Sequence, residues 1–280
     1  MSAAPKRVVV LAEPESLFLP NCLARLAREH PIAAIVEVPA TPLRVALRRS
    51  LTSFGAGVTA AVAAAEILAR IVDTLAPDRF YSLAKLARRL EIPYERVSDL
   101  HAPDCIDAIR RHDPDVVFAQ VGRRIRPELL ALVPFWNKHC SLLPSYAGVF
   151  PVFWTLLERG DAGVTIHVMD EEFDRGPILQ QRASASRARS FFALYHELYA
   201  EVPALLVHAL RGEVAAPARK TEPSYRGFPT RDDRREFRRR GLRFGFPFRL
   251  HARIRLVPQA LPQRLARSGC PSIGAASTRS

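Results

Sequence analysis

Three residues of the types that catalyse acyl transfer lie in two segments of this chain. Asn137 and His139 belong to the run N-K-H-C-S-L-L-P, and Asp174 belongs to F-D-R-G-P-I-L. An amide and an imidazole can donate hydrogen bonds to a carbonyl oxygen that becomes negatively charged, and a carboxylate can orient the imidazole and help remove a proton from an attacking amine. The trio contains no obvious nucleophile and no cluster of metal ligands. The trio predicts metal-free transfer of an activated acyl group, and the small pocket implied by S-L-L-P favours a one-carbon unit.

The spacing of Asn137 and His139 predicts how they are presented. Side chains two residues apart on an extended segment share one face, and open α/β sheets bind ligands in the crevice at the carboxyl ends of their strands. Asp174 lies in a D-R-G-P loop before a further strand, where its carboxylate can reach the imidazole. A lone histidine or a D-x-G-P turn is usually structural, so the whole constellation carries this prediction.

The surrounding segments alternate between strand-like and helix-like patterns. Apolar, β-branched runs predict strands, and apolar residues at helical spacing predict helices. The predicted strands are 7–12, 32–38, 94–100, 115–120, 163–169 and 177–185, and the predicted helices are 17–29, 104–111, 127–133, 151–159 and 190–210. This order predicts an α/β fold with a Rossmann-like, doubly wound, mostly parallel sheet. Residues 41–91 break the alternation with three helix-like stretches, which we interpret as a helical insertion.

The positive charge is concentrated near the C-terminus. The chain has a formal net charge of +13, and counting from Arg219 to Ser280 finds 16 Arg and Lys against 4 Asp and Glu, a surplus of 12. We predict a catalytic domain over residues 5–214 and an Arg-rich, partly disordered extension over 215–280. Clustered arginine attracts phosphate, so the extension keeps tRNA as a partner; the competing interpretation is a solvated tail with a compositional arginine bias.

The cysteines and the apolar segments indicate in which cellular compartment the protein is expected. The four cysteines lack C-x-x-C spacing, which argues against structural zinc and against a disulfide framework. No apolar segment reaches the about 20 residues that a membrane-spanning helix needs, and no secretory signal is visible. We therefore expect a reduced, cytoplasmic protein without a membrane span.

Three stretches resemble the folate-dependent formyltransferases. They are N-K-H-C-S-L-L-P-S-Y-A-G, G-V-T-I-H-V-M-D and F-D-R-G-P-I-L, and the resemblance is strongest over 116–181. The family includes methionyl-tRNA, glycinamide ribonucleotide and sugar-nucleotide N-formyltransferases as well as formyltetrahydrofolate hydrolases. The resemblance implies that Asn137, His139 and Asp174 match the family's catalytic residues and that 10-formyltetrahydrofolate is the formyl donor.

The resemblance also implies folate contacts. Residues 122–130 look like the loop whose backbone holds the pterin ring, and residues 171–174 look like a second loop on the pterin side. Arginines of the first loop are candidates for the anionic glutamate tail of the folate. The implied cofactor-binding residues are Arg124, Ile125, Arg126, Leu142, Glu171 and Phe173.

The expected acceptor is a small-molecule amine, and we rank the candidate acceptors by the features that the sequence lacks. The family member that uses glycinamide ribonucleotide grips its phosphate in a Gly-rich loop after the first strand, whereas this chain has A-E-P-E-S-L-F-L-P-N there. The C-terminal part is short beside the barrel-like domain of a tRNA formyltransferase. An amino-sugar nucleotide therefore ranks first, and methionyl-tRNA or glycinamide ribonucleotide second. We also consider hydrolysis of the folate and non-catalytic binding of folate or RNA.

Two features have two interpretations each, and Cys140 has one. His167 alternates with Ile166 and Val168, so its side chain faces either the acceptor pocket or the opposite surface of the sheet. The 41–91 insertion is either a lid over the crevice or a homodimer surface. Cys140 is expected to point away from His139, which disfavours a role as nucleophile.

Overall fold

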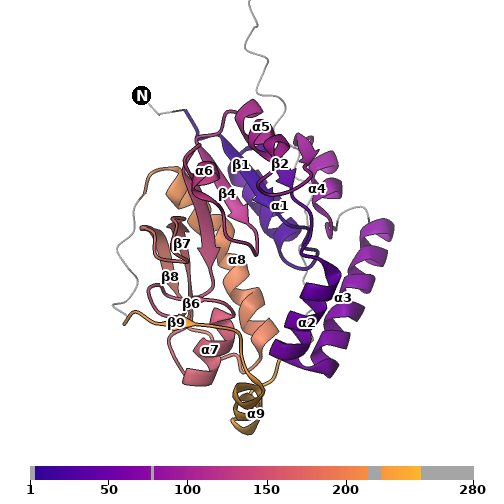
Figure 1. The fold of residues 1–280 in the computed structure, drawn as a ribbon, viewed down its shortest axis with the longest axis vertical. Helices are drawn as coiled ribbons and strands as arrows, with labels where there is room; N and C mark the ends of the chain where they lie inside the picture. The colour runs from indigo at the N-terminus through magenta and orange to yellow at the C-terminus, as the bar shows by residue number, and fades with distance from the viewer. Residues whose placement is uncertain (1–3, 77–78, 214–221, 247–280) are drawn as a thin grey trace, which may run out of the picture. The chain divides into compact units, whose positions relative to one another are not determined.

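A seven-stranded sheet organises the chain, of which the computed structural model describes residues 4–76, 79–213 and 222–246. The strand order is β3-β2-β1-β4-β5-β7-β8, and Figure 1 labels β2, β1, β4, β7 and β8 of these strands. The strands are β1 Val8–Ala12, β2 Ile32–Glu37, β3 Tyr94–Arg96, β4 Val116–Gln120, β5 Phe135–His139, β7 Gly163–Val168 and β8 Ile178–Ala183. The first five strands pair in parallel, and β7 and β8 each pair antiparallel to the preceding strand. The predicted α/β, mostly parallel, Rossmann-like sheet is confirmed.

Helices cover both faces of this sheet. They are α1 Leu19–Glu29, α4 Leu83–Arg89, α5 Pro103–Arg111, α6 Pro127–Leu130, α7 Pro151–Glu158 and α8 Phe191–Leu210. On one face, alternate residues of β1 and β2 pack with apolar residues of α5 and α6 in a single buried cluster. On the other face, α1 packs against α8, which lies over β7 and β8. Both faces of β1 are therefore buried, which explains its uninterrupted run of valine and leucine.

Two strands differ from the expectation. β3 ends at Arg96 instead of extending to 100, because the chain turns there and the Ser98 amide donates to the Asp104 carboxylate at the start of α5 (2.7 Å). β7 runs antiparallel to β5 because α7 does not return the chain to the end of the sheet at which β5 begins. Instead β7 starts near the carboxyl end of β5, and His139 pairs with Thr165.

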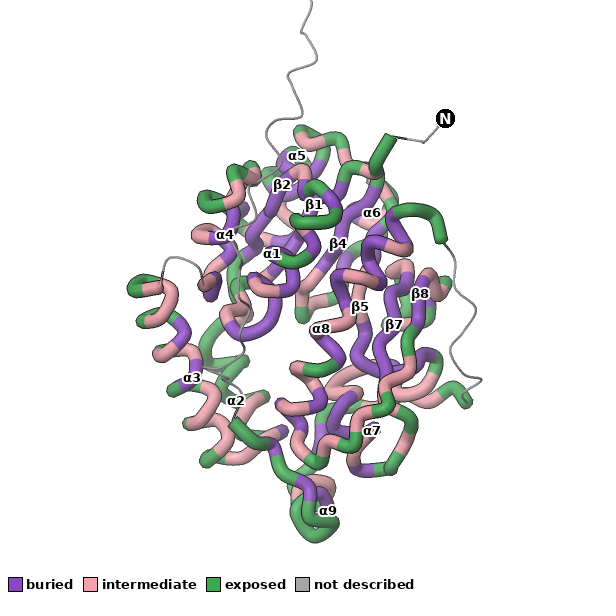
Figure 2. The backbone as a smooth tube through the Cα atoms, turned by 180° about the vertical axis from the view of Figure 1, so that it is seen from behind, coloured by how far each residue is buried: buried purple, intermediate pink, exposed green. Residues whose placement is uncertain are grey.

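The insertion forms a helical hairpin, α2 Leu43–Phe54 and α3 Ala56–Leu75, followed by α4. Gly55, with φ of +83°, makes the turn between the two long helices, a conformation that favours glycine. Phe54 anchors one end, since its ring contacts Phe150, Phe191 and Phe244. Figure 2 shows that most of the hairpin's backbone is exposed or only partly buried.

Residues 222–246 pack against the body of the protein. β6 Ala147–Gly148 pairs with β9 Tyr225–Arg226 in a second, two-stranded sheet. A capping box formed by Thr230 and Asp233 begins α9 Arg231–Arg239, and the fully buried ring of Phe237 stacks on Phe153 at 4.6 Å. The boundary at 214 stays a prediction, and residues 215–221 and 247–280 of the predicted extension lie outside the described residues. In the described parts, no helix is both long and apolar enough to cross a membrane.

Candidate active site

The register of β5 and β7 sets the geometry of the predicted trio. Asn137 and His139 lie on β5, two residues apart, and Asn137 pairs directly with His167 of β7. Because β7 follows β5 antiparallel, the imidazole of His167 is brought to the same side as Asn137 and His139, where its ring centroid lies 6.5 Å from that of His139. The structure therefore decides between the two interpretations of His167, since its side chain faces the trio.

Asp174 lies between the two histidines. Its Oδ2 is 3.5 Å from His139 Nδ1, and its Oδ1 is 3.5 Å from His167 Nε2. The Gly148 amide donates to Oδ2 at 2.8 Å and fixes the carboxylate. Asp174 has φ of +56°, a left-handed backbone that a non-glycine residue adopts at a cost of about 1–3 kcal/mol. Backbone strain and a fixed carboxylate at the same residue indicate a functional position.

The outer nitrogens of both rings contact backbone carbonyls. His139 Nε2 is 2.8 Å from the Tyr146 oxygen, and His167 Nδ1 is 2.9 Å from the Val168 oxygen. A carbonyl oxygen only accepts hydrogen bonds, so each of these nitrogens carries the ring's proton. In each neutral ring the lone pair of the other nitrogen then faces Asp174.

Burial keeps these rings neutral. His139 is 6% and His167 1% exposed at the side chain. Burial lowers the pKa of His139 below its ordinary value, and the Asp174 carboxylate partly opposes this. Burial likewise lowers the pKa of His167. Two lone pairs and a carboxylate thus converge on one point, an arrangement that a single added proton would stabilise.

Asn137 is oriented by a residue that the sequence analysis did not consider. Gln120, the last residue of β4, donates from Nε2 to Asn137 Oδ1 at 2.8 Å and to the Ala119 oxygen at 2.7 Å. The Tyr199 hydroxyl lies 3.5 Å from Gln120 Oε1. Because Asn137 Oδ1 is engaged, its Nδ2 hydrogens are left for another acceptor. In the sequence, Gln120 is recognisable as the polar last residue of the otherwise apolar strand D-V-V-F-A-Q, which could have marked it as a functional residue.

Five of the six implied folate-binding residues come from two loops that the structure brings together, and the sixth, Leu142, follows β5. Arg124 Nη2 donates to the Glu171 oxygen at 2.5 Å, which joins the 122–130 loop to the 171–174 loop. Arg126 is exposed, and Phe173 is 52% exposed. Ile125 and Leu142 are buried, with Ile125 in the cluster beneath the sheet. Four of the six residues are therefore exposed to solvent, and the other two, Ile125 and Leu142, are buried in the core.

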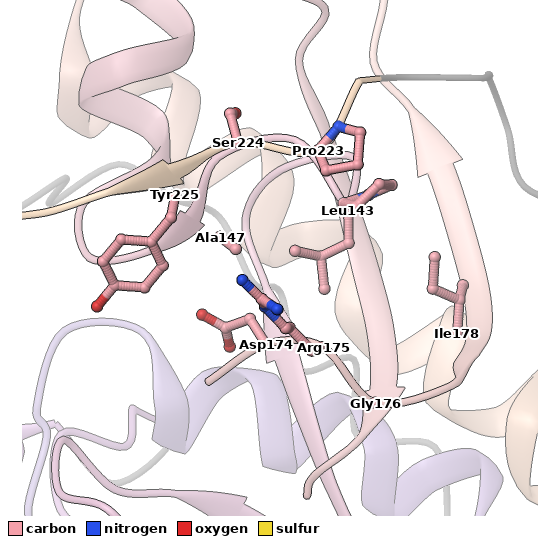
Figure 3. A pocket seen from close by; sticks show the side chains of 10 residues that line it. Leu143, Ala147, Asp174, Arg175, Gly176, Ile178, Pro223, Ser224 and Tyr225 are labelled. Atoms are coloured by element: carbon pink, nitrogen blue, oxygen red, sulfur yellow. The ribbon is translucent and has the colours of Figure 1, made fainter. Parts of the chain in front are cut away.

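A cavity of about 400 Å³ opens beside Asp174. The loop 174–176, the 143–147 segment and the 223–225 segment enclose it. In Figure 3 the Asp174 carboxylate and the Arg175 guanidinium point into the space that Leu143 and Tyr225 flank. Its volume falls within the range of small-molecule sites, about 300–1,000 Å³.

The N-terminus of α1 is closed by a carboxylate of the chain itself. Glu15 accepts hydrogen bonds from the amides of Leu17 (2.7 Å), Phe18 (3.0 Å) and Leu19. These are the amides that would otherwise be available to an anion at a helix start. The A-E-P-E-S-L loop thus satisfies its own helix without a phosphate.

The side of β5 opposite the trio carries Lys138. Its Nζ donates to the Tyr195 hydroxyl at 3.1 Å and lies 4.3 Å from the centre of the Tyr199 ring. Cys140, also buried, is the next alternate residue on that side. Strand alternation therefore separates the thiol and the amine from Asn137 and His139, as expected for Cys140. No group of metal ligands occurs among the residues that the structure describes.

Comparison with solved structures finds the same fold in enzymes that act on different acceptors. A phosphoribosylglycinamide formyltransferase from Anaplasma phagocytophilum is 17% identical, with a TM-score of 0.52, over 80% of this chain and 99% of that chain. A sugar N-formyltransferase from Shewanella sp. is 14% identical, with a TM-score of 0.51, over 82% and 86%. A likely sugar N-formyltransferase from Mycobacterium tuberculosis is 19% identical, with a TM-score of 0.50, over 79% and 75%. At these identities the likeness establishes the fold.

A family model described as formyl transferase matches residues 6–202. This range contains Asn137, His139 and Asp174, both loops of the implied folate site and the whole seven-stranded sheet. Because the match covers well over half of the chain, this protein belongs to the formyl transferase family and is a formyl-group transferase.

Proposed function

We propose that this enzyme transfers the formyl group of 10-formyltetrahydrofolate to a primary amine, with an amino-sugar nucleotide as the acceptor. The observation that carries the proposal is the carboxylate of Asp174 between two neutral imidazole nitrogens, on the same side as the Asn137 amide. Formyl transfer to an amine requires a group that receives a proton and a group that stabilises an oxyanion, and these residues supply both.

Asn137 is the direct hydrogen-bond donor to the formyl oxygen. When the amine nitrogen forms its bond to the formyl carbon, negative charge develops on that oxygen. Gln120 holds Asn137 Oδ1, so Nδ2 is directed to the oxygen before the reaction begins. A preorganised donor of this kind typically contributes about 10²–10³ in kcat.

Asp174 receives the proton of the attacking amine, directly or through water. Once protonated, Asp174 can pass this proton to Nδ1 of His139, whose lone pair faces it, and the imidazole then becomes positively charged while Asp174 returns to a carboxylate. His139 Nε2 stays on the Tyr146 carbonyl throughout, so this ring stabilises the oxyanion by its charge. Collapse of the intermediate breaks the bond between the formyl carbon and N10 of the folate, and that nitrogen takes up the proton that Asp174 and His139 received from the amine.

The paired loops fit the folate. Arg124 ties the 122–130 loop to the backbone of Glu171, and the exposed ring of Phe173 lies on the second loop. The cationic side chain of Arg126 is exposed at the edge of this pair and suits the glutamate tail of the donor. Ile125 and Leu142 support the loops from the core.

The proposed acceptor follows from two features. Glu15 occupies the amides at the start of α1, so a phosphate placed there would lose its hydrogen-bond donors and meet a carboxylate. This disfavours glycinamide ribonucleotide held in the manner of its own transformylase. The cavity beside Asp174 has room for one sugar ring, with Tyr225 as an aromatic wall.

A turnover assay tests the proposal. The purified protein is supplied with 10-formyltetrahydrofolate and, separately, with pooled amino-sugar nucleotides, glycinamide ribonucleotide and charged initiator tRNA. Tetrahydrofolate release is followed optically, and the formylated product is identified by mass. We expect release that depends on the amino-sugar nucleotides and is lost in Asp174→Asn. Asp107→Asn, a change at an exposed carboxylate on α5, is the matched control.

The remaining arms of the assay separate the competing functions. Release that depends on tRNA or on glycinamide ribonucleotide would replace the proposed acceptor while keeping the transferase. Release of equal rate without any acceptor would identify a hydrolase. Folate binding without turnover by the wild-type protein would contradict catalysis by this site.

A further inference from the structure

The α2–α3 hairpin exposes most of the large apolar side chains found on the surface of the described residues. Eleven large apolar residues are exposed, and seven of them belong to these two helices. They are Leu43, Val45, Leu47, Leu51, Ile67, Ile71 and Leu75, with exposed fractions from 39% to 81%. Single exposed apolar residues are ordinary, but such a concentration marks an interaction surface.

On each helix three of these residues form one stripe that points away from the body, and Val45, about 200° around α2 from Leu43, lies outside it. Leu43, Leu47 and Leu51 recur at intervals of four on α2, and Ile67, Ile71 and Leu75 do so on α3. The fully buried residues of α3 are Ala65 and Ala69. At 100° per residue, Ile67 and Ile71 lie about 200° around the helix from these alanines. The apolar stripe of α3 is therefore on the side opposite the packed one.

The hairpin's acidic groups face the body instead. Asp73 accepts hydrogen bonds from the Tyr81 amide (2.7 Å) and the Ser82 hydroxyl (2.9 Å), and it pairs with Lys85. Glu66 lies near enough to Glu15 to contribute to the raised pKa of that carboxyl, after the larger effect of burial. Neither carboxylate thus interrupts the outward apolar stripe.

The charge beside this stripe is positive. α2 carries Arg44, Arg48 and Arg49 and contains no acidic residue. At the Gly55 turn the guanidinium groups of Arg234 and Arg238, from α9, approach the hairpin, and Arg234 donates to the Leu51 oxygen at 3.4 Å. Exposed leucines and isoleucines next to unneutralised arginines are the pattern of helices that lie in a membrane interface.

We propose that the α2–α3 hairpin docks this enzyme on an anionic lipid surface. The aliphatic stripe inserts between lipid headgroups and acyl chains, and the arginines of α2 and α9 contact the anionic headgroups. A second copy of this chain is the less suitable partner, since a symmetric contact through the hairpin would set α2 arginines against α2 arginines. RNA is also less suitable, because it gives no burial to aliphatic side chains.

Vesicle flotation with the full chain tests this proposal. One set of vesicles is phosphatidylcholine alone, and the other is phosphatidylcholine mixed with phosphatidylglycerol. We expect at least about tenfold tighter binding to the anionic set, weakened by salt. The double substitutions Leu47→Glu with Ile71→Glu, and Arg44→Glu with Arg48→Glu, should each reduce binding about tenfold or more. Arg88→Glu with Arg89→Glu, an exposed pair on α4, is the charge-matched control and should retain binding.

A fluorescent reporter tests insertion of the stripe without changing the charge of the protein. Leu47→Trp should shift its fluorescence to the blue on anionic vesicles and be quenched by lipids brominated in the acyl chain. Circular dichroism and thermal unfolding confirm that each variant is folded. Absence of binding to anionic vesicles would overturn the proposal, as would equal weakening by the α4 control. A dimer that Leu47→Glu abolishes, or RNA binding that needs the same leucines, would assign the surface to another partner.

Discussion

The carboxyl edge of β5 and the α2–α3 hairpin both depart from the usual rule that polar side chains face solvent and apolar side chains are buried. At the edge of β5, polar and titratable groups are buried: His139, His167 and Asp174 are each at most 10% exposed at the side chain. On the hairpin, large aliphatic groups face solvent, with Leu43 81% and Leu75 76% exposed. Neither arrangement stabilises an isolated chain, so each indicates something that binds there.

The two regions also differ in how they are held. The polar groups at the edge of β5 are fixed by hydrogen bonds: Asp174 by the Gly148 amide, His139 by the Tyr146 carbonyl and Asn137 by the Gln120 side chain. The hairpin is tied to the body chiefly at its ends, by Phe54 and by Asp73. Substitutions at the first region should therefore change chemistry, whereas substitutions on the second should change only association.

The largest effect is expected for Asp174→Asn. An amide cannot receive the amine's proton, so kcat should fall about 10³–10⁴-fold, near the upper limit for general acid–base catalysis. Steady-state kinetics with the acceptor identified by the turnover assay measures this. Thermal unfolding should stay close to wild type, since the amide keeps the shape and the Gly148 contact. Activity within about tenfold of wild type would refute the proton-acceptor role.

Gln120→Leu should lower kcat by about 10-fold to 10²-fold with little change in KM, less than the loss of the donor itself. The leucine keeps the volume but leaves Asn137 Oδ1 without its partner, so the amide no longer points its nitrogen in a fixed direction. Asn137→Ala should be more severe, and adding Gln120→Leu to it should cost nothing further. Additive losses in the double variant would mean that Gln120 acts elsewhere.

His167→Gln tests the buried neutral ring through the pH dependence of stability. Burial depresses the folded pKa of His167, so below its ordinary value of about 6.5 the unfolded chain binds a proton that the folded chain resists. Wild type therefore loses stability through this group as the pH falls from about 7.5 to 5. The unfolding temperature of His167→Gln, relative to wild type, should rise over that interval. An unchanged difference between the two proteins would show that His167 does not contribute.

The smallest effect is expected for Leu47→Glu in lipid-free solution. The side chain is 47% exposed, so the free energy of unfolding should change by no more than about 0.5 kcal/mol, and kcat for a water-soluble acceptor should be unchanged. Denaturant unfolding and the turnover assay measure the two quantities. A loss above about 2 kcal/mol would mean that the leucine packs within the protein.

Local pattern predicted much of the sheet and part of the site. The runs at β1, β2 and β4 are buried on both faces, and such strands are readable because all their residues are apolar or nearly so. Asn137 and His139 share a face because alternation is a property of one strand. The position of His167 was not predictable, because it depends on the direction in which β7 pairs with β5.

Other features depended on contacts between distant segments. Gln120 orients Asn137 from the neighbouring strand, and Phe237 fills a space beside Phe153 from a distant part of the chain. A helical pattern at 41–91 predicted helices, but the helices' exposure followed from the small area that Ala65 and Ala69 offer to the body. Catalytic assignment of the trio remains a prediction that the kinetics above would test.

The alternation of side chains along β5 places the amine of Lys138 on the side of the sheet opposite Asn137 and His139. In the proposed reaction an activated formyl donor reacts with a primary amine, and a lysine, which is itself a primary amine, lies in sequence between Asn137 and His139. The pleat directs that amine to the far side of the sheet, where Tyr195 and Tyr199 enclose it. A shift of one residue in this strand would turn the lysine to the side of the sheet that carries Asn137 and His139. Under the proposed function, the alternation of β5 thus keeps this amine away from the formyl donor.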